Sequence, residues 1–143
     1  MENLKNQVME NGVYNAYRMA IAPNQSTSYI MNSTASIMPI VDKVEVREYG
    51  DSTTFYPMPY LNYDNFFFYK SAYDMDQKNI LKLVSVIQRH VDQGISTILY
   101  TKSTDTTRDL SKLYILAHKL GLKSLYYTRT RKSTIEECIS CSV

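Results

Sequence analysis

The second half of the chain alternates between helical and β-branched patterns, and this alternation restricts the fold more than any other feature. After Asp76, apolar residues recur at the spacing of an amphipathic helix, which we expect to end at Gly94. The residues predicted to share its apolar face are Ile80, Leu83, Val84, Ile87 and Val91. Residues 95–100 ("ISTILY") then predict a strand, because they are apolar and rich in β-branched side chains.

A second helix and strand follow. Thr104 or Asp105 is expected to cap the helix and Gly121 to end it, and its apolar face is predicted to comprise Leu110, Leu113, Tyr114 and Ala117. Residues 122–127 ("LKSLYY") predict the second strand. Strand, helix and strand within such a short segment form a βαβ unit, in which the strands are parallel and the crossover is right-handed.

The first half gives weaker signals. Leu4, Val8 and Met9 predict a short helix that ends at Asn11-Gly12. Residues 13–23 ("VYNAYRMAIAP") predict a buried strand that stops at Pro23. Residues 42–63 are expected to be irregular, because charged residues, glycine and proline interrupt every pattern there.

Composition excludes several classes. The 143 residues fit at most one domain, and the net charge of +2 comes without any basic cluster, which argues against nucleic-acid binding. No apolar run approaches a membrane span and the amino terminus is not a signal peptide, so no membrane contact is expected. Both cysteines lie in the last six residues, which disfavours a disulfide-stapled secreted fold and favours a cytoplasmic protein.

A run of small polar residues follows Pro23. Asn24 and Gln25 precede the hydroxyls of Ser26, Thr27 and Ser28, just where a helix is expected to begin. Free backbone N–H groups at such a turn can bind a phosphate. The same residues are also typical of a simple helix cap, and composition leaves both interpretations open.

The chain closes with the pair Cys138 and Cys141. A zinc site is disfavoured, because four ligands are needed and only His90 and His118, both in predicted helices, remain. Two thiols on a flexible tail that starts near Tyr127 could instead move over about 17–20 Å and exchange with a disulfide elsewhere. Two incidental exposed cysteines are the remaining alternative.

Tyr126 and Tyr127 are adjacent at the end of the last predicted strand. Neighbouring side chains of a strand point to opposite faces, so we expect one phenol on each side of the sheet. One interpretation is ordinary packing of Tyr126 on the helix with Tyr127 facing solvent or a partner. The other is a pair of stacked phenols that passes a radical from one face to the other, at the carboxyl edge where sites gather in parallel sheets.

Several segments together resemble one family, the large (α) subunit of class I ribonucleotide reductase, and most of all its class Ib type. The similar segments cover nearly the whole chain and are "YNAYRMAIAPNQSTSYIMNST", "YPMPYL", "HVDQGISTILY", "TTRDLSKLYILAH", "GLKSLYYTRT" and "CISC". The resemblance implies an α/β fold, namely the C-terminal part of the ten-stranded α/β barrel (residues 1–128, an incomplete domain) followed by a flexible redox-active tail (residues 129–143).

The resemblance also implies residue roles in making deoxyribonucleotides for DNA replication. Pro23, Asn24, Gln25, Ser26 and Thr27 would bind the phosphates of a ribonucleoside diphosphate. Tyr126 and Tyr127 would relay a radical from the small (β) subunit, which holds a di-metal tyrosyl radical cofactor, while this chain binds no cofactor of its own. Cys138 and Cys141 would re-reduce the active-site disulfide and be reduced in turn by thioredoxin or a glutaredoxin-like protein.

One departure from the family pattern matters. The family reaction needs three further cysteines, whereas no cysteine precedes Cys138 here. We therefore expect a fragment, either a split-gene product or an excised piece of an interrupted gene, that is inactive without the N-terminal part of the large subunit and the small subunit. Isolated, it would leave sheet edges and an apolar face uncovered. The alternative is a non-catalytic module that binds the small subunit or a redoxin through its tail.

Overall fold

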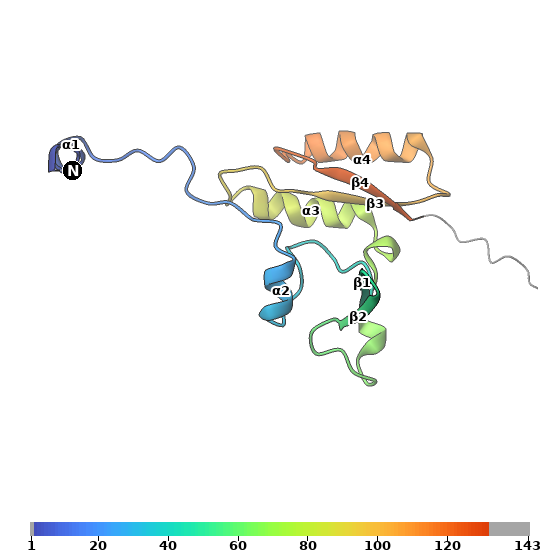
Figure 1. The fold of residues 1–143 in the computed structure, drawn as a ribbon. Helices are drawn as coiled ribbons and strands as arrows, with labels where there is room; N and C mark the ends of the chain where they lie inside the picture. The colour runs from blue at the N-terminus through green and yellow to red at the C-terminus, as the bar shows by residue number, and fades with distance from the viewer. Residues whose placement is uncertain (1, 132–143) are drawn as a thin grey trace, which may run out of the picture.

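The computed structural model describes residues 2–131. It contains the predicted βαβ unit, with helix α3 beside it (Figure 1). Helix α3 (Gln77–Gln88) leads to strand β3 (Ile98–Lys102), helix α4 (Thr107–Lys119) and strand β4 (Tyr127–Arg131). The two strands pair in parallel, with Ile98 opposite Tyr127 and Lys102 opposite Arg131. The predicted parallel pairing is confirmed, but both strands begin later than predicted, at Ile98 instead of residue 95 and at Tyr127 instead of residue 122.

The helix ends differ from the predicted positions. Helix α3 stops at Gln88, six residues before Gly94, because the Gln88 amide donates to the carbonyl oxygens of Val91 (3.1 Å) and Gln93 (2.8 Å) and closes the loop there. Helix α4 is capped by Thr106, whose hydroxyl accepts from the Asp109 N–H at 3.2 Å. Neither predicted cap, Thr104 nor Asp105, has that role.

The predicted apolar faces are mostly correct. Leu83 is the exception in α3: it is 57% exposed, whereas Leu81 is fully buried. On α4, Ala117 is buried, but Tyr114 stays 44% exposed. A helical face is broad, so periodicity alone does not decide which residue at its margin points inward.

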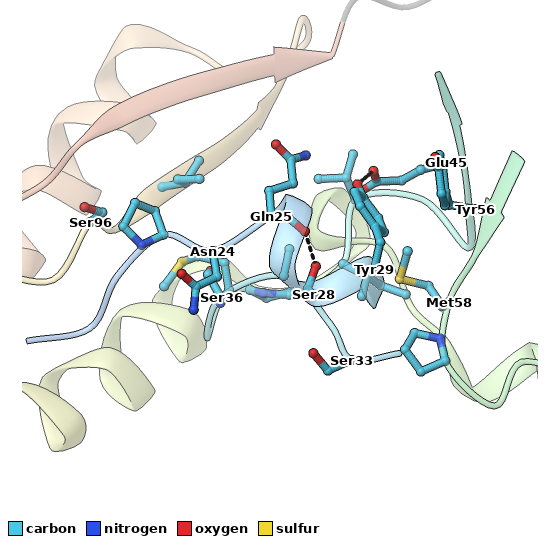
Figure 2. Close-up of a pocket in the computed structure, with 18 of the residues that line it drawn as sticks. Asn24, Gln25, Ser28, Tyr29, Ser33, Ser36, Glu45, Tyr56, Met58 and Ser96 are labelled. Atoms are coloured by element: carbon cyan, nitrogen blue, oxygen red, sulfur yellow. Dashed lines mark hydrogen bonds between the residues drawn. The ribbon is translucent and has the colours of Figure 1, made fainter. Parts of the chain in front are cut away.

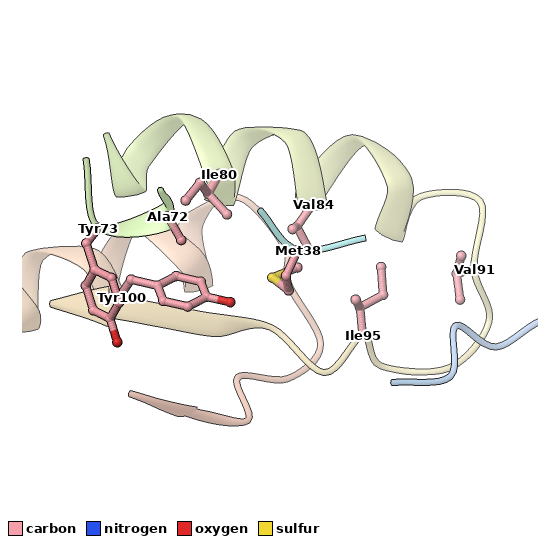
Figure 3. Packing of buried hydrophobic residues seen from close by; sticks show 8 residues of the cluster. All are labelled: Met38, Ala72, Tyr73, Ile80, Val84, Val91, Ile95 and Tyr100. Carbon is pink, nitrogen blue, oxygen red and sulfur yellow. The ribbon is translucent and has the colours of Figure 1, made fainter. Parts of the chain in front are cut away.

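Two apolar clusters make up the core. The first (Figure 3) joins α3, the loop before β3, and segments from the first half of the chain; its buried members are Met38, Ala72, Tyr73, Ile80, Val84, Val91, Ile95 and Tyr100. The second joins α3, β3 and α4 through Leu81, Leu99 and Ala117. Because Leu99 and Tyr100 are adjacent in β3, the two clusters occupy opposite faces of that strand.

The first half contains elements that the sequence did not reveal. Strands β1 (Val44–Tyr49) and β2 (Ser52–Pro57) form an antiparallel hairpin within the segment expected to be irregular, and Gly50 (φ +58°) makes the turn. Both strands contain apolar residues, but Val44, Val46 and Phe55 are exposed and adjoin polar residues, so no continuous buried run marks the hairpin in the sequence. Single turns of 3₁₀-helix, η1 (Phe66–Phe68) and η2 (Ala72–Asp74), connect it to α3.

The predicted strand at residues 13–23 is wrong. Helix α1 (Glu2–Asn11) is present as expected, but the segment after it is extended and exposed without joining a sheet. Asp92 holds it instead: its Oδ2 accepts from the N–H groups of Arg18 (2.8 Å) and Met19 (3.0 Å). These hydrogen bonds lower the pKa of the Asp92 carboxyl. Among the described residues there is no neighbouring strand to pair with this segment.

No closed barrel forms within residues 2–131, where the strands make two separate two-stranded sheets. Strand β4 includes residues 129–131, which the sequence assigned to the tail. Both edges of β3 are nonetheless used: one pairs with β4, and on the other the Tyr100 N–H donates to the Gln77 side-chain oxygen at 3.0 Å.

Gly94 is required by a close approach of two backbone segments. A Cβ at this position would lie 2.5 Å from Ser124 Oγ and 3.1 Å from Ser124 Cβ. Ser124 Oγ itself donates to the Ile95 carbonyl at 3.0 Å, so it cannot move freely. This contact joins the loop before β3 to the loop before β4.

We predict that Gly94→Ala destabilises the chain by about 1–3 kcal/mol, because the new methyl group overpacks this contact. Ser124→Gly removes both clashing atoms, so the double variant should lose less stability than the sum of the two single variants. Chemical unfolding of the four proteins measures the coupling. Strictly additive losses would contradict the proposed contact.

Candidate functional site

A cavity of about 350 Å³ opens between helix α2 (Ser26–Ile30), the β1–β2 hairpin and the β3–β4 sheet. Figure 2 shows the start of α2 lying between β4, in pale red, and the hairpin. Pro23, Asn24 and Gln25 line the cavity, and so do Tyr126 and Tyr127. The structure therefore brings together two groups of residues that the sequence singled out separately, about 100 positions apart.

The turn before α2 leaves backbone donors free. Gln25 is the N-cap residue but forms no side-chain capping hydrogen bond, and within the described chain the Ser26 and Thr27 N–H groups have no acceptor. Ser28 Oγ donates to the Gln25 carbonyl at 2.5 Å (Figure 2). The hydroxyls of Ser26 and Thr27 do not cap the helix, so the simple-cap interpretation does not describe this turn. Ser26 and Thr27 begin α2 but do not line the cavity.

The opposite wall couples α2 to the hairpin. The Tyr29 hydroxyl donates to the Glu45 carboxylate (Figure 2), and its ring stacks on Tyr56 with centroids 4.5 Å apart. The Arg47 guanidinium lies 4.7 Å from the Tyr29 ring centroid. Burial, and then the adjacent Glu45, raise the pKa of the Tyr29 phenol. These contacts fix the direction of α2, and therefore of the turn that precedes it.

The tyrosine pair differs from its predicted geometry. Tyr126 precedes β4 and Tyr127 is its first residue, so the pair lies at the amino end of the strand and not at the carboxyl edge. The rings meet edge to face with centroids 4.9 Å apart and planes at 66°, and both line the cavity. The two side chains need not point to opposite faces of the sheet, because Tyr126 lies outside the strand. The Tyr126 N–H donates to the Thr97 carbonyl at 2.8 Å.

Tyr100 extends this aromatic group. It lines the cavity beside Tyr127 and meets Tyr73 edge to face at 5.5 Å. Burial, and then Tyr127, raise the pKa of the Tyr100 phenol from 10.0 to about 12, whereas Arg129 opposes this rise. Sequence reasoning missed Tyr100 and Arg129, although the two-residue period of paired strands places them on the face shared by Ile98 and Tyr127. Glu45 and Tyr56 gave no sequence signal, because only the hairpin brings them to Tyr29 of α2.

The predicted thiols, Cys138 and Cys141, lie outside the described residues. Within residues 2–131, no group of three or more His, Cys, Asp or Glu side chains comes together as a metal site. The same part of the chain contains no helix with the length and apolar character needed to cross a membrane.

Comparison with known proteins agrees with the sequence resemblance. Residues 1–128 match the family model for the ribonucleotide reductase barrel domain. The chain is 54% identical over 140 residues to the ribonucleoside-diphosphate reductase NrdEB subunit alpha of Bacillus subtilis, 98% of this chain and 13% of that protein. It is 49% identical over 142 residues to another ribonucleoside-diphosphate reductase subunit alpha of the same organism, 99% of this chain and 20% of the relative.

A more distant relative is the ribonucleoside-diphosphate reductase subunit alpha of Mycoplasma pneumoniae, which is 42% identical over 132 residues and covers 91% of this chain and 18% of its own length. Such matches define a class, the barrel domains of ribonucleotide reductases. The chain belongs to this ribonucleotide reductase family, and it spans between 13% and 20% of the length of these three curated relatives.

We predict that Tyr100 ionises near pH 12 in the folded chain, because its burial disfavours the charged form. The unfolded chain ionises this residue near pH 10. The contribution of Tyr100 to stability is therefore present below about pH 10 and is lost as the pH rises to about 12. Ultraviolet titration should show a late phase that Tyr100→Phe removes and Tyr63→Phe retains. A late phase that survives Tyr100→Phe would refute the assignment.

Proposed function

We propose that this chain supplies the C-terminal barrel segment and the redox-active tail of a ribonucleoside-diphosphate reductase large subunit. The observation that supports this most is that one cavity is lined both by the turn at Pro23–Gln25 and by the Tyr126–Tyr127 pair. A phosphate-binding turn and an oxidisable aromatic pair at one cavity fit an enzyme that holds its substrate beside a radical entry point. Family membership supports the same reaction class.

In this proposal the turn binds the diphosphate of the substrate. Asn24 and Gln25 form the cavity wall, and the free N–H groups of Ser26 and Thr27, which follow them at the start of α2 without lining the cavity, are the proposed hydrogen-bond donors at its edge. Backbone donors bind an anion without the cost of ordering long side chains. The contacts of Tyr29 with Glu45 and Tyr56 keep the turn in place before the substrate arrives.

The two tyrosines form the proposed relay. Each phenol loses an electron and a proton together when it is oxidised and regains both when the radical moves on, so the pair is unchanged after each passage. The edge-to-face contact at 4.9 Å allows transfer between the rings without a change in the backbone. The radical would come from the di-metal tyrosyl cofactor of the small subunit and end on a cysteine supplied by the remaining part of the large subunit.

Cys138 and Cys141 are the proposed shuttle. The dithiol would reduce the active-site disulfide by thiol–disulfide exchange, become a disulfide itself, and be reduced by thioredoxin or a glutaredoxin-like protein. Whether this chain arises from a split gene or an interrupted one does not alter these roles. In both cases the complementary part of the large subunit must supply the missing cysteines.

We predict that reconstitution with the N-terminal part of a large subunit and the small subunit restores reduction of ribonucleoside diphosphates, and that Tyr126→Phe lowers this activity by about 100-fold or more. Phenylalanine cannot be oxidised by the relay, and a 100-fold loss corresponds to about 2.7 kcal/mol in the barrier. Tyr63→Phe, at a residue 96% exposed, is the matched control. Unchanged activity in Tyr126→Phe would disprove the relay. Binding of the small subunit without restored activity would favour the non-catalytic module.

The shuttle makes a separate prediction. In the reconstituted enzyme, Cys138→Ser should abolish turnover driven by thioredoxin but spare turnover driven by dithiothreitol, which reaches the active site directly. Ser140→Ala is the control within the same tail and should retain both activities. Equal losses with both reductants would show that Cys138 does not act as a shuttle.

A further inference from the structure

The charges that line the cavity do not cancel. Within the described chain, its charged lining residues are Glu45 and Arg129. Glu45 is already engaged, because its carboxylate accepts the Tyr29 hydroxyl hydrogen bond and lies 3.5 Å from Arg47 Nη2. Arg129 forms no ion pair with any carboxylate of the described chain. The cavity is therefore left with one uncompensated positive charge.

The position of Arg129 is set by strand register. It lies directly opposite Tyr100 of β3 and two residues after Tyr127, so the three side chains share one face of the sheet. The turn at Asn24 and Gln25 lines the same cavity. A ligand bound in this cavity would have both the turn and Arg129 in the lining around it.

We propose that Arg129 is a substrate-binding residue for the anionic diphosphate group, an inference that rests on the proposed function and assigns a side-chain cation to its phosphate site. A guanidinium presents a planar set of donors that can bind two phosphate oxygens at once. Neutral donors at Asn24, Ser33 and Ser36 line the cavity and can complete the contacts. Arg129 is exposed, so an anion can reach its guanidinium directly from solvent.

The first test measures the binding of inorganic pyrophosphate to the full chain by isothermal titration calorimetry. Arg129→Gln should weaken binding by about tenfold or more, as expected for loss of a charge-assisted bidentate contact. Arg108→Gln, at an exposed arginine on α4, is the matched control and should bind as the wild type does. Arg129→Lys keeps the charge without the planar fork and should fall between the two. Equal affinities of the wild type and Arg129→Gln, or no binding to the wild type, would overturn the proposal.

The second test separates this inference from the proposed function. In the reconstituted reductase, Arg129→Gln should raise KM for a ribonucleoside diphosphate by about tenfold with little change in kcat. A lower kcat at unchanged KM would place Arg129 in the radical relay beside Tyr127 and overturn the anion assignment. Normal KM and kcat would also overturn it, while leaving the proposed function intact. Absence of activity with the wild-type chain would instead disprove the proposed function.

Discussion

Parallel pairing of β3 with β4 is the interaction on which the rest of the structure depends. The register places Ile98 beside Tyr127 and Tyr100 beside Arg129, so one face of the pair lines the cavity. Leu99, on the other face of β3, packs against Leu81 and Ala117. A shift by one residue would exchange these faces and bury Arg129 among leucines, which fixes the register strongly.

The first half of the chain is held together mainly by individual side-chain contacts. Its helix α2 is held by specific contacts, the Tyr29–Glu45 hydrogen bond and the Tyr29–Tyr56 stack, and not by a large core of its own. The segment before it is tied to the βαβ unit through Asp92 and otherwise remains exposed, with Tyr14 at 88%. Such a surface is consistent with a domain whose relatives continue well beyond the length of this chain.

The cavity combines chemistry from both halves. The turn before α2 provides uncapped backbone donors, the βαβ unit provides an oxidisable pair, and β4 adds a cation, Arg129, to the same cavity lining. In the proposed function, the phosphate contacts come from backbone groups and the relay from the start of a strand, so each group is held in position without a bound ligand. An enzyme that generates a radical benefits from such preorganisation, because the reactive group must meet its substrate in one geometry.

The sequence by itself determined the βαβ unit, the family and the residue types of the site, because helical periodicity, β-branched runs and close-set motifs are local properties. It did not determine the β1–β2 hairpin, whose short strands lack a continuous apolar run, or the structure of residues 13–23, where an apolar pattern alone does not create a neighbouring strand. Only the tertiary structure decided that Tyr126 and Tyr127 meet edge to face at the amino end of β4, and that Arg129 and Gln25 line one cavity. These relations depend on strand register and on contacts between distant segments, and neither is written in local sequence patterns.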